Sequence, residues 1–595
     1  MPNHERNPDG SARHRASAMD RARRWHAADP DPDDRARLLS LIDEQDRSAI
    51  DGLFDGRLHF GTAGLRAPVG VGPNRMNRLM SAITALATAR VLMEQAGTDP
   101  VGPVVVAHDA RRGSREFAAE ITDALCASGL HAMTISGPAP TPLAAFAVRH
   151  LDASAGMVVT ASHNPARDNG IKVYWSDGAQ IAPPVDRQIS DAMDNLFVDL
   201  WSGGQIIGPH GPARGSVEDL GSVEDLGSVE DLGSVEDLGS VEEGTPLVEA
   251  YLSEAAGLPR SEGRHPVVVA YTALHGVGAD LLELALGRMQ SVELVQVASQ
   301  REPDPLFPTV EFPNPEEPGA MREVLELADA VSADLAIAND PDADRLAIAA
   351  PAEEGGWQVL SGDETGALLA HHLFTLTSDI DDRLVATTVV SSRLLGSMAR
   401  ADGVHFEETL TGFKWLCRPA LEHPEWTQVL IYEEALGYAI GPLARDKDGI
   451  TAAVVAVDLA RQLASSGRTV WDLLDDLAER HGAHVTANGS RRLDGPDARD
   501  RLDGLAAELV AHPPTTLGGN RVSDSDQPAG DVLRLWLTDG TRVVLRPSGT
   551  EPKFKYYCEA IEPVGTDRDS RAARRRARLR LRRIERDLVA LFGSA

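Results

Sequence analysis

Short apolar runs that end in polar turns recur along the chain and predict its architecture. The runs at 104–107, 157–159, 266–270 and 335–338 are too short for helices and are typical of buried strands. Stretches with helical spacing of apolar residues separate these runs. Strand, polar loop and helix in repeated succession predict an α/β fold, in which ligands gather where the strands end. The polar turns are therefore the places to look for chemistry.

The run at 157–159 opens onto the sequence TASHNP, which places Ser162 and His163 at the end of a predicted strand. The proline disfavours a helix, so the turn is tight and polar. A hydroxyl beside an imidazole at a strand end suits a nucleophile or a phosphoryl carrier. Lys172 follows ten residues after Ser162, and a return strand would bring its ammonium back to the serine. Taken alone, TASHNP also fits an ordinary Ser/Asn/Pro loop.

A second polar turn, NDPDADR, contains carboxylates at alternating positions, Asp340, Asp342 and Asp344, followed by Arg345. Like charges this close repel unless a cation lies among them. An EF-hand is excluded, because Arg345 stands where glycine is required and Pro351 stands where glutamate is required. Oxygen ligands with few protein donors suit Mg²⁺ that keeps a phosphate oxygen or a water. A solvated acidic turn is the alternative.

Three further polar stretches fit the binding of anions or sugars. FGTAGLR permits close approach of a ligand to its glycines and offers Arg66 to an anion. ETLTGFKW contains Lys414, and IYEEALGY places Glu433 and Glu434 at the end of another predicted strand. Carboxylates beside a lysine suit sugar hydroxyls. Each stretch alone could equally be structural.

The C-terminal part of the chain has a different pattern. Residues 532–537 and 541–545 alternate around Asp539 and Gly540, which predicts an antiparallel hairpin. The hairpin leads into RPSGTEPKFK, a compact candidate phosphate site of hydroxyls, backbone N–H groups and basic side chains. Its members are Arg546, Ser548, Gly549, Thr550, Lys553 and Lys555. A solvated turn is the alternative. The arginine-rich segment 571–586 predicts a surface helix that packs on the C-terminal domain. Binding of RNA or of an acidic partner is the second interpretation.

Composition narrows the class of protein. The 595 residues carry a formal net charge of −32, which argues against general binding to nucleic acid or anionic membranes. Cys126, Cys417 and Cys558 are too scattered for a disulfide framework or a zinc cluster. We find neither a signal peptide nor an apolar run long enough to cross a bilayer. We therefore expect a cytoplasmic protein whose partners are small molecules.

A low-complexity insert interrupts the pattern. GSVEDL occurs four times in succession from Gly215 and is followed by GSVEE. Each unit is short, acidic and punctuated by glycine, which predicts a solvated, mobile surface loop and a boundary between domains.

Together these turns provide a serine at a strand end, a carboxylate metal loop, a turn for sugar hydroxyls and a separate phosphate site. An enzyme that needs all four acts on a substrate with phosphate at two ends. A serine- and metal-dependent phosphatase would not need the second phosphate site, and a serine esterase would use a G-x-S-x-G elbow that Ser162 lacks. A non-catalytic phosphosugar sensor would tolerate loss of Ser162 or of a metal carboxylate, and neither is lost.

The ordered motifs FGTAGLR, TASHNP, DPDADR, EEALGY and RPSGTEPK resemble the α-D-phosphohexomutase superfamily over almost the whole chain. Longer strings such as TASHNPARDNGIKVYW are most similar to its phosphopentomutase and glucose-bisphosphate-synthase branch. The resemblance implies three related α/β domains and a C-terminal α+β phosphate-binding domain around a central cleft. The predicted divisions are a partly disordered, then helical extension (1–56), domain I with the phosphoserine loop (57–210), the insert (211–245), domain II with the metal loop (246–350), domain III with the sugar loop (351–485) and domain IV with the phosphate loop (486–595).

The resemblance also implies the reaction of a phosphosugar mutase. Ser162 would carry the phosphoryl group and, with Asp340, Asp342 and Asp344, bind one Mg²⁺ per subunit. Transfer to the substrate gives a bisphosphate that turns and returns its other phosphate, and a sugar 1,6-bisphosphate acts as activator. Positions that match proton transfer and charge stabilisation are His163, Lys172, Arg66 and Lys414. Positions that match substrate binding are Arg345, Glu433, Glu434, Arg546, Ser548, Gly549, Thr550 and Lys555.

The motifs do not define which sugar phosphate is the substrate. We expect conversion of glucose 1-phosphate to the 6-phosphate, with mannose second; a phosphopentomutase or a sugar-1,6-bisphosphate synthase is the alternative. Many hexose-phosphate members carry a serine and a histidine in the sugar loop, where this chain has Leu436 and Tyr438. Glucose, mannose and pentose phosphates therefore all stay open.

Overall fold

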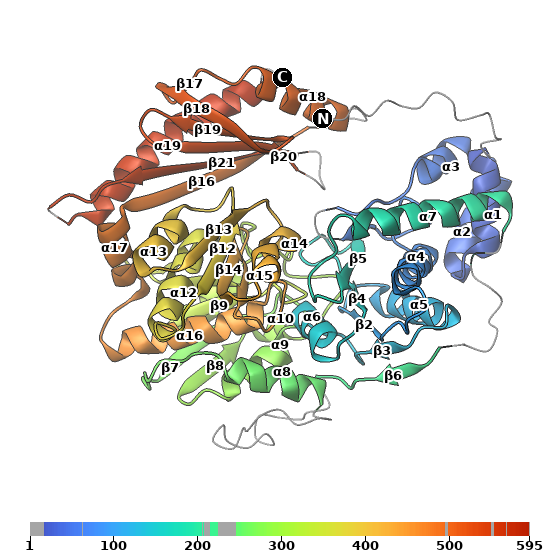
Figure 1. The fold of residues 1–595 in the computed structure, drawn as a ribbon, viewed down its shortest axis with the longest axis horizontal. Coiled ribbons are helices and arrows are strands. Elements are labelled where there is room, and N and C mark those ends of the chain that lie inside the picture. The colour runs from blue at the N-terminus through green and yellow to red at the C-terminus, as the bar shows by residue number, and fades with distance from the viewer. Residues whose placement is uncertain are drawn as a thin grey trace.

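Four β-sheets follow one another along the chain (Figure 1). The computed structural model describes residues 17–61, 64–204, 206, 215–223, 246–493, 498–548, 553–566 and 568–593. The first three sheets belong to α/β units, and the fourth is an antiparallel sheet with a long helix along it. The predicted fold class, with three α/β domains and a distinct C-terminal domain, is confirmed.

The first sheet has the strand order β1-β5-β4-β2-β3-β6. Strand β5 returns antiparallel to β4 and places Lys172 opposite Val158, as the sequence predicts for a return strand. The strands are β1 (Leu65–Pro68), β2 (Val104–His108), β3 (Ala132–Thr134), β4 (Ala155–Val159), β5 (Asp168–Trp175) and β6 (Val217–Asp219). The helices of this unit are α4 (Arg78–Ala96), α5 (Ser114–Ala127), α6 (Thr141–His150) and α7 (Val185–Ser202).

Strand β6 comes from the first GSVEDL unit, where the sequence predicts a solvated, mobile loop; its residues are exposed, but they form a strand rather than a loop. Val217 pairs in parallel with Ala132, and Asp219 pairs with Thr134. The open edge of β3 offers hydrogen-bonding groups to a chain that has no structure of its own, and the sequence pattern does not reveal such an edge. Leu220 then packs against the largest apolar cluster. The second unit is described only from Gly221 to Val223, and Val223 is buried in the same cluster. The rest of the repeat lies outside the described residues, as do residues 1–16, the N-terminal part of the extension predicted to be disordered.

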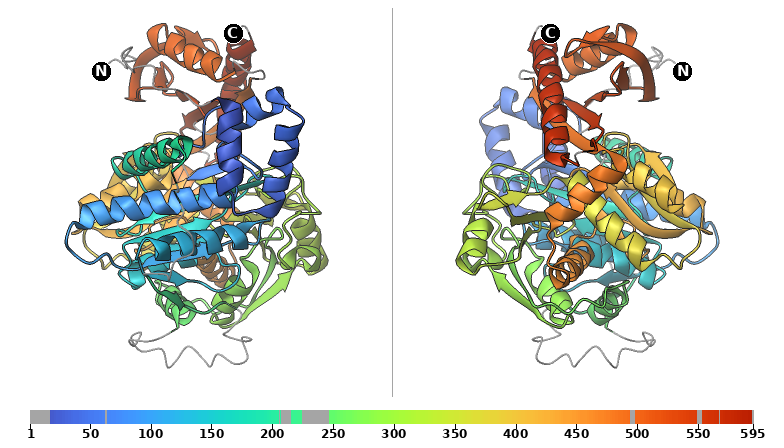
Figure 2. Two further views of the ribbon diagram at one scale, coloured as in Figure 1. Left: turned by 90° about the vertical axis from the view of Figure 1, so that its right-hand side faces the viewer. Right: turned by 90° about the vertical axis from the view of Figure 1, so that its left-hand side faces the viewer.

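Three helices precede the first sheet and pack against it through α7. They are α1 (Ala18–Ala28), α2 (Pro32–Asp43) and α3 (Arg47–Phe54). Trp25 is fully buried, with its ring centroid 6.0 Å from Phe54 and 6.5 Å from Phe197 on α7. This aromatic contact fixes the N-terminal helices on domain I (Figure 2, left).

The second and third sheets have the orders β11-β10-β9-β7-β8 and β13-β12-β14-β15. The second unit contains α8 (Leu247–Ala256), β7 (Val267–Thr272), α9 (Ala279–Gly287), β8 (Val292–Gln296), α10 (Ala298–Arg301), α11 (Arg322–Ala330), β9 (Leu335–Ala338), β10 (Ala347–Pro351) and β11 (Trp357–Val359). The third contains α12 (Gly362–Leu376), β12 (Arg383–Thr388), α13 (Leu394–Asp402), β13 (His405–Thr409), α14 (Phe413–Leu416), α15 (Arg418–Glu422), β14 (Thr427–Glu433), β15 (Gly437–Ile440), α16 (Gly449–Ser465) and α17 (Val470–His481). One apolar cluster continues through both units and into α6, so the three α/β units share a core.

The fourth sheet lies above the third in Figure 1 and has the order β16-β21-β20-β19-β18-β17. The predicted hairpin is present as β19 and β20, paired from Leu533 with Leu545 to Trp536 with Arg542. The arginine-rich segment is helical, and its Ile584 and Leu588 are fully buried against this domain, as predicted. The elements are β16 (Ala483–Arg492), α18 (Ala498–Ala511), β17 (Thr516–Leu517), β18 (Asn520–Ala529), β19 (Val532–Leu537), β20 (Arg542–Pro547), β21 (Lys553–Glu562) and α19 (Ser570–Gly593).

Cys126, Cys417 and Cys558 are free thiols buried in separate domains. Burial raises the pKa of each thiol, so each is protonated at neutral pH and poorly reactive. In the described part of the chain, no helix has both the length and the apolar character needed to cross a membrane.

Candidate functional site

Ser162 lies in the turn that follows β4, where its φ of 52° is unusual for a residue other than glycine. Its Oγ donates to Asp340 Oδ2 at 2.7 Å and lies 3.1 Å from His163 Nδ1. Arg111, from the turn after β2, donates to the carbonyl oxygens of Ser162, Asn164 and Pro165. The backbone of the serine turn is therefore fixed by a buried guanidinium from the neighbouring strand.

The three carboxylates predicted to bind a metal come together in the turn after β9. Asp340, Asp342 and Asp344 are fully buried, and one oxygen from each lies within 4.8 Å of the others. Burial, and then the charges of the other two carboxylates, raise the pKa of Asp340 well above its ordinary value. Among the described residues, Asp342 Oδ1 and Asp344 Oδ1 have no hydrogen-bond partner. Buried carboxylate oxygens without partners are what a hard divalent cation needs, so these residues fit a site for such an ion.

Two lysines border the carboxylates. Lys172 Nζ donates to Asp342 Oδ2 at 2.7 Å and to Asp344 Oδ2 at 2.5 Å. Burial acts against its charge, but the two aspartates outweigh burial and raise the pKa of Lys172. Lys447 Nζ lies 3.2 Å from Asp344 Oδ2 and 3.3 Å from Asp446 Oδ1. Both ammonium groups are therefore charged, and they offset part of the negative charge of the loop.

Sequence reasoning missed Lys447. It lies in the stretch ARDKDG between β15 and α16, and a dense run of alternating charges after a strand was the available signal. The side chain of Lys447 packs against the sugar loop. A Cβ added to Gly437 would lie 2.4 Å from Lys447 Cδ. Glycine is therefore required at position 437 for the loop to lie this close to Lys447.

His163 and Arg66 lie on the serine side of the cluster. Burial, followed by the charges of Arg345 and Arg66, holds the pKa of His163 well below its ordinary value. The imidazole is therefore neutral at neutral pH. Arg66 Nη1 donates to Asn164 Oδ1 at 3.2 Å, while its buried Nε has no hydrogen-bond partner among the described residues. Such a guanidinium can still receive an anion.

The sugar loop follows β14 and touches the metal loop. Arg345 pairs with Gly437 through a backbone bridge, and its Nη1 donates to Glu316 Oε2 at 3.0 Å. Burial raises the pKa of Glu433 to about 7, against the charge of Lys447. Glu434 Oε2 accepts hydrogen bonds of 3.1 Å from the hydroxyls of Thr388, the last residue of β12, and Ser391, in the turn that follows.

The two sugar-loop positions that depart from the hexose pattern are buried. Leu436 has a φ of 63° and packs in the apolar cluster of domain II. Tyr438 is fully buried, and its hydroxyl donates to the carbonyl of Gly362 at 3.2 Å. Glu433 and Glu434 are therefore the polar side chains of this loop, whose sequence is EEALGY.

Domain IV brings a basic group to the other side of the sugar loop. Arg546 Nη1 donates to Thr411 Oγ1 of domain III at 2.7 Å, and its Nε has no hydrogen-bond partner among the described residues. Burial lowers the pKa of Arg546, but Tyr557, Glu434 and Glu433 outweigh burial and raise it. Ser548 is buried, and Lys555 pairs in register with Arg546. Gly549 and Thr550 lie outside the described residues.

Lys414 occupies a different place from the other predicted catalytic residues. Its Nζ lies 3.7 Å from Asp186 Oδ2, near the start of α7. Burial lowers the pKa of Lys414, and Asp186 opposes this effect. Its role as a second acid or base stays a prediction.

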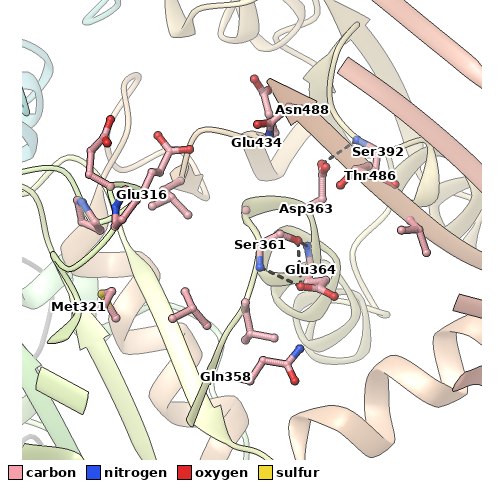
Figure 3. A pocket seen from close by; sticks show the side chains of 18 of the residues that line it. Glu316, Met321, Gln358, Ser361, Asp363, Glu364, Ser392, Glu434, Thr486 and Asn488 are labelled. Atoms are coloured by element: carbon pink, nitrogen blue, oxygen red, sulfur yellow. Dashed lines mark hydrogen bonds between the residues drawn. The ribbon is translucent and has the colours of Figure 1, made fainter. Parts of the chain in front are cut away.

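A cavity of about 710 Å³ opens between domains II, III and IV (Figure 3). Glu316 and Glu434 line one side of it, and Asp363, Ser392 and Thr486 line another. Ser162 and the three aspartates are not part of its wall. The cavity therefore adjoins the sugar loop on the side that faces domain IV.

Comparison with known proteins agrees with this geometry. The family models for phosphoglucomutase/phosphomannomutase alpha/beta/alpha domains I, II and III match residues 57–197, 249–355 and 361–481. A phosphopentomutase of Mus musculus is 33% identical over 607 residues, covering 94% of this chain and 93% of the relative. A phosphoglucomutase of Staphylococcus aureus (strain MSSA476) is 32% identical, covering 85% of this chain and 90% of the relative.

A solved structure has the same fold. A phosphoglucomutase/phosphomannomutase family protein from Burkholderia thailandensis superimposes with a TM-score of 0.62 at 21% identity, covering 87% of this chain and 96% of that chain. The chain therefore belongs to the phosphoglucomutase/phosphomannomutase family and is a phosphosugar mutase.

Proposed function

We propose that the protein is a phosphopentomutase that interconverts ribose or deoxyribose 1-phosphate and the 5-phosphate. The observation that carries this proposal is the burial of Leu436 and Tyr438, which leaves the sugar loop with carboxylates alone. A pentose phosphate has fewer hydroxyls to satisfy than a hexose phosphate, and it leaves fewer polar groups without partners in such a loop. The similarity to relatives named phosphopentomutase, 33% identical over most of the chain, supports the same sugar.

In the proposed reaction, Ser162 carries a phosphoryl group that passes to the 5-hydroxyl of a pentose 1-phosphate. The P–Oγ bond breaks, a P–O5 bond forms, and the proton of the 5-hydroxyl passes through a neighbouring base to Ser162 Oγ. The resulting 1,5-bisphosphate turns in the site. Ser162 Oγ then attacks the phosphate on C1, a P–Oγ bond forms as the P–O1 bond breaks, O1 takes up the proton given up by the serine, and the 5-phosphate is released. The neutral imidazole of His163, 3.1 Å from Ser162 Oγ, is placed to take the serine proton in this second step.

The surrounding charges suit a travelling phosphoryl group. Asp340, Asp342 and Asp344 would hold one Mg²⁺, which supplies charge neutralisation for the phosphoryl oxygens when bound. Lys172 holds two of these carboxylates in place, and Arg66 would offer a phosphate oxygen its Nε, which has no partner within the described ranges. A trace of sugar 1,6-bisphosphate would be needed to phosphorylate Ser162 in enzyme that has lost its phosphoryl group.

The other end of the substrate would be held by the sugar and phosphate loops. Glu433 and Glu434 would accept hydrogen bonds from the sugar hydroxyls. Arg546, with Ser548, Gly549, Thr550 and Lys555, would bind the phosphate that does not react. Acidic and basic side chains alternate between the metal loop and the phosphate loop. Asp344 raises the pKa of Lys447, Lys447 acts to lower the pKa of Glu433, and Glu433 acts to raise the pKa of Arg546.

Glucose, the sugar favoured by the initial sequence reading, is the second candidate, because a phosphoglucomutase is 32% identical to this chain. The test is a coupled assay with Mg²⁺ and a trace of glucose 1,6-bisphosphate, in which ribose, deoxyribose, glucose and mannose 1-phosphates are compared and phosphate release is followed. We expect kcat/KM for ribose 1-phosphate to exceed that for glucose 1-phosphate by about tenfold or more. The reverse order would overturn the pentose assignment and leave the mutase assignment intact. Phosphate release without isomerisation would instead indicate a phosphatase, and no turnover of any of the four substrates would indicate a sugar-bisphosphate synthase or a non-catalytic sensor.

A further inference from the structure

The turn between β12 and α13, residues 389–393, contacts both the sugar loop and domain IV. Toward the sugar loop, Ser391 Oγ and the preceding Thr388 Oγ1 donate to Glu434 Oε2. Toward domain IV, the carbonyl of Ser391 accepts from Arg542, and Ser392 Oγ donates to Glu559 Oε1 at 2.7 Å. One turn of five residues therefore lies between the predicted sugar ligand and the domain that carries the phosphate loop.

Glu559 on β21 is the centre of the domain IV side of this contact. Besides Ser392, it accepts from the N–H of Arg393 at 2.8 Å and from Arg393 Nε at 2.5 Å. His484 Nδ1 lies 2.8 Å from the same carboxylate, and Arg542 Nη2 lies 3.5 Å from it. The side chain has no exposed surface. Burial raises the pKa of Glu559, but these partners outweigh burial and lower it, so the carboxylate is charged.

The same pair of strands carries the phosphate loop. Glu559 pairs in register with Arg542, and four residues along the ladder Lys555 pairs with Arg546. The two pairs are separated by roughly 13 Å of strand. Because both lie on β20 and β21, a shift of this hairpin relative to the turn would move Arg546 away from the sugar loop.

A role in stability alone does not account for this arrangement. A buried carboxylate is costly unless several donors satisfy it, and apolar replacement of such groups is often neutral or stabilising. Apolar contact between the same elements is already present, since Val389 and Val390 pack against Val544 and Tyr557. The charged contact adds a fixed distance and orientation, which apolar packing defines less well.

We propose that Glu559 is a positioning residue that fixes the separation between the sugar loop and the phosphate loop. It holds the 389–393 turn, Ser391 of this turn and the preceding Thr388 hold Glu434 through their hydroxyls, and the hairpin of Glu559 carries Arg546. This inference rests on the proposed function only in taking Glu434 and Arg546 as substrate ligands, and it holds for either a pentose or a hexose.

The test replaces Glu559 with glutamine and measures kcat, KM and thermal stability with the sugar phosphate that the enzyme turns over best. The matched control is Glu562→Gln on the same strand, whose partners Arg576 and Arg580 both belong to α19 of domain IV. We expect Glu559→Gln to raise KM about tenfold and to lower kcat, and Glu562→Gln to change both by less than about twofold. Ser392→Ala, which removes one contact of Glu559, covers the case in which Glu559→Gln does not fold.

The decisive measurement is a double-mutant cycle between position 559, or position 392 as substitute, and Glu434→Gln. If Glu559 acts by positioning Glu434, the two substitutions do not reduce kcat/KM independently. The kcat/KM of the double variant then lies within about threefold of that of the less active single variant. Losses that multiply, or a KM that stays at the wild-type value while stability falls, would overturn the proposal. A preference for glucose over ribose in the same assays would refute the pentose assignment without affecting this result.

Discussion

The two ends of the predicted substrate path differ in how tightly the protein fixes them. At the serine end, fully buried carboxylates contact groups from three domains, including Thr141 and Lys172 of domain I and Lys447 of domain III. At the phosphate-loop end, the contact that Arg546 makes across the domain boundary within the described part of the chain is a hydrogen bond to Thr411. The reacting end is therefore enclosed by contacts from several domains, whereas the binding end depends on how one domain sits against another.

This difference suits the chemistry of the proposed reaction. Charge develops on the phosphoryl group near Ser162, and donors fixed in advance stabilise it without reorganising. The phosphate on the far side only has to be held, and it exchanges places with the reacting one in each turnover. A site on a separate domain permits that exchange because it can release and rebind its phosphate.

Removing the nucleophile is expected to have the largest effect. Ser162→Ala should reduce turnover at least about 10³-fold, because without Oγ no phosphoenzyme forms. Sugar phosphate binding, measured by calorimetry, should remain. Ser176→Ala, which removes an exposed hydroxyl beyond β5, is the control and should match the wild type. Turnover of Ser162→Ala close to that of the wild type would break the assignment of the reacting end.

Loss of one metal carboxylate should be the next largest effect. Asp342→Asn removes the negative charge of a carboxylate whose Oδ1 has no hydrogen-bond partner among the described residues. It also weakens the contact between Lys172 and this side chain. We expect the Mg²⁺ concentration for half-maximal activity to rise about tenfold and kcat to fall about 10–100-fold. Asp329→Asn, an exposed aspartate of α11, is the control. An unchanged Mg²⁺ titration for Asp342→Asn would mean that the loop does not bind the metal.

A substitution at the binding end should act mainly on KM. Arg546→Gln should raise KM about tenfold, which corresponds to about 1.4 kcal/mol, and change kcat much less. The exposed Arg521 of β18 provides the control Arg521→Gln. If kcat fell as far as in Asp342→Asn, the contrast between the two ends would not hold.

The smallest expected effect is on thermal stability and follows from substitution of the buried Asp363, which lines the cavity beside the sugar loop. Burial raises its pKa to about 7, against the N–H of Ser392, and Glu434 and Glu559 raise it further. Folding therefore favours the protonated form, and the contribution of Asp363 to stability falls as pH rises from about 4 to about 7. Asp363→Asn should raise the melting temperature by about 2 °C at pH 8 and leave it unchanged at pH 4. An equal shift at both pH values would show that charge at this position does not matter.

The sequence predicted the local motifs of the site better than the contacts between them. TASHNP and DPDADR each place their polar residues at a strand end, and the strands β4 and β9 are present where predicted. Lys447 and Glu559 could not be ranked from sequence, because the contacts that reveal them, with Asp344 and with Ser392, join residues more than 100 positions apart along the chain. The first GSVEDL unit was misread for a related reason, since the free edge of β3 that orders it exists only in the folded sheet.

The buried thiols make this protein suitable for distance measurements by fluorescence. Cys126, Cys417 and Cys558 are shielded and protonated, so a thiol-reactive dye would discriminate strongly against them. One cysteine introduced on an exposed helix of domain I and another on α19 could be labelled selectively without first removing native cysteines. Energy transfer between the two dyes would then report whether the distance between domain I and domain IV changes during turnover.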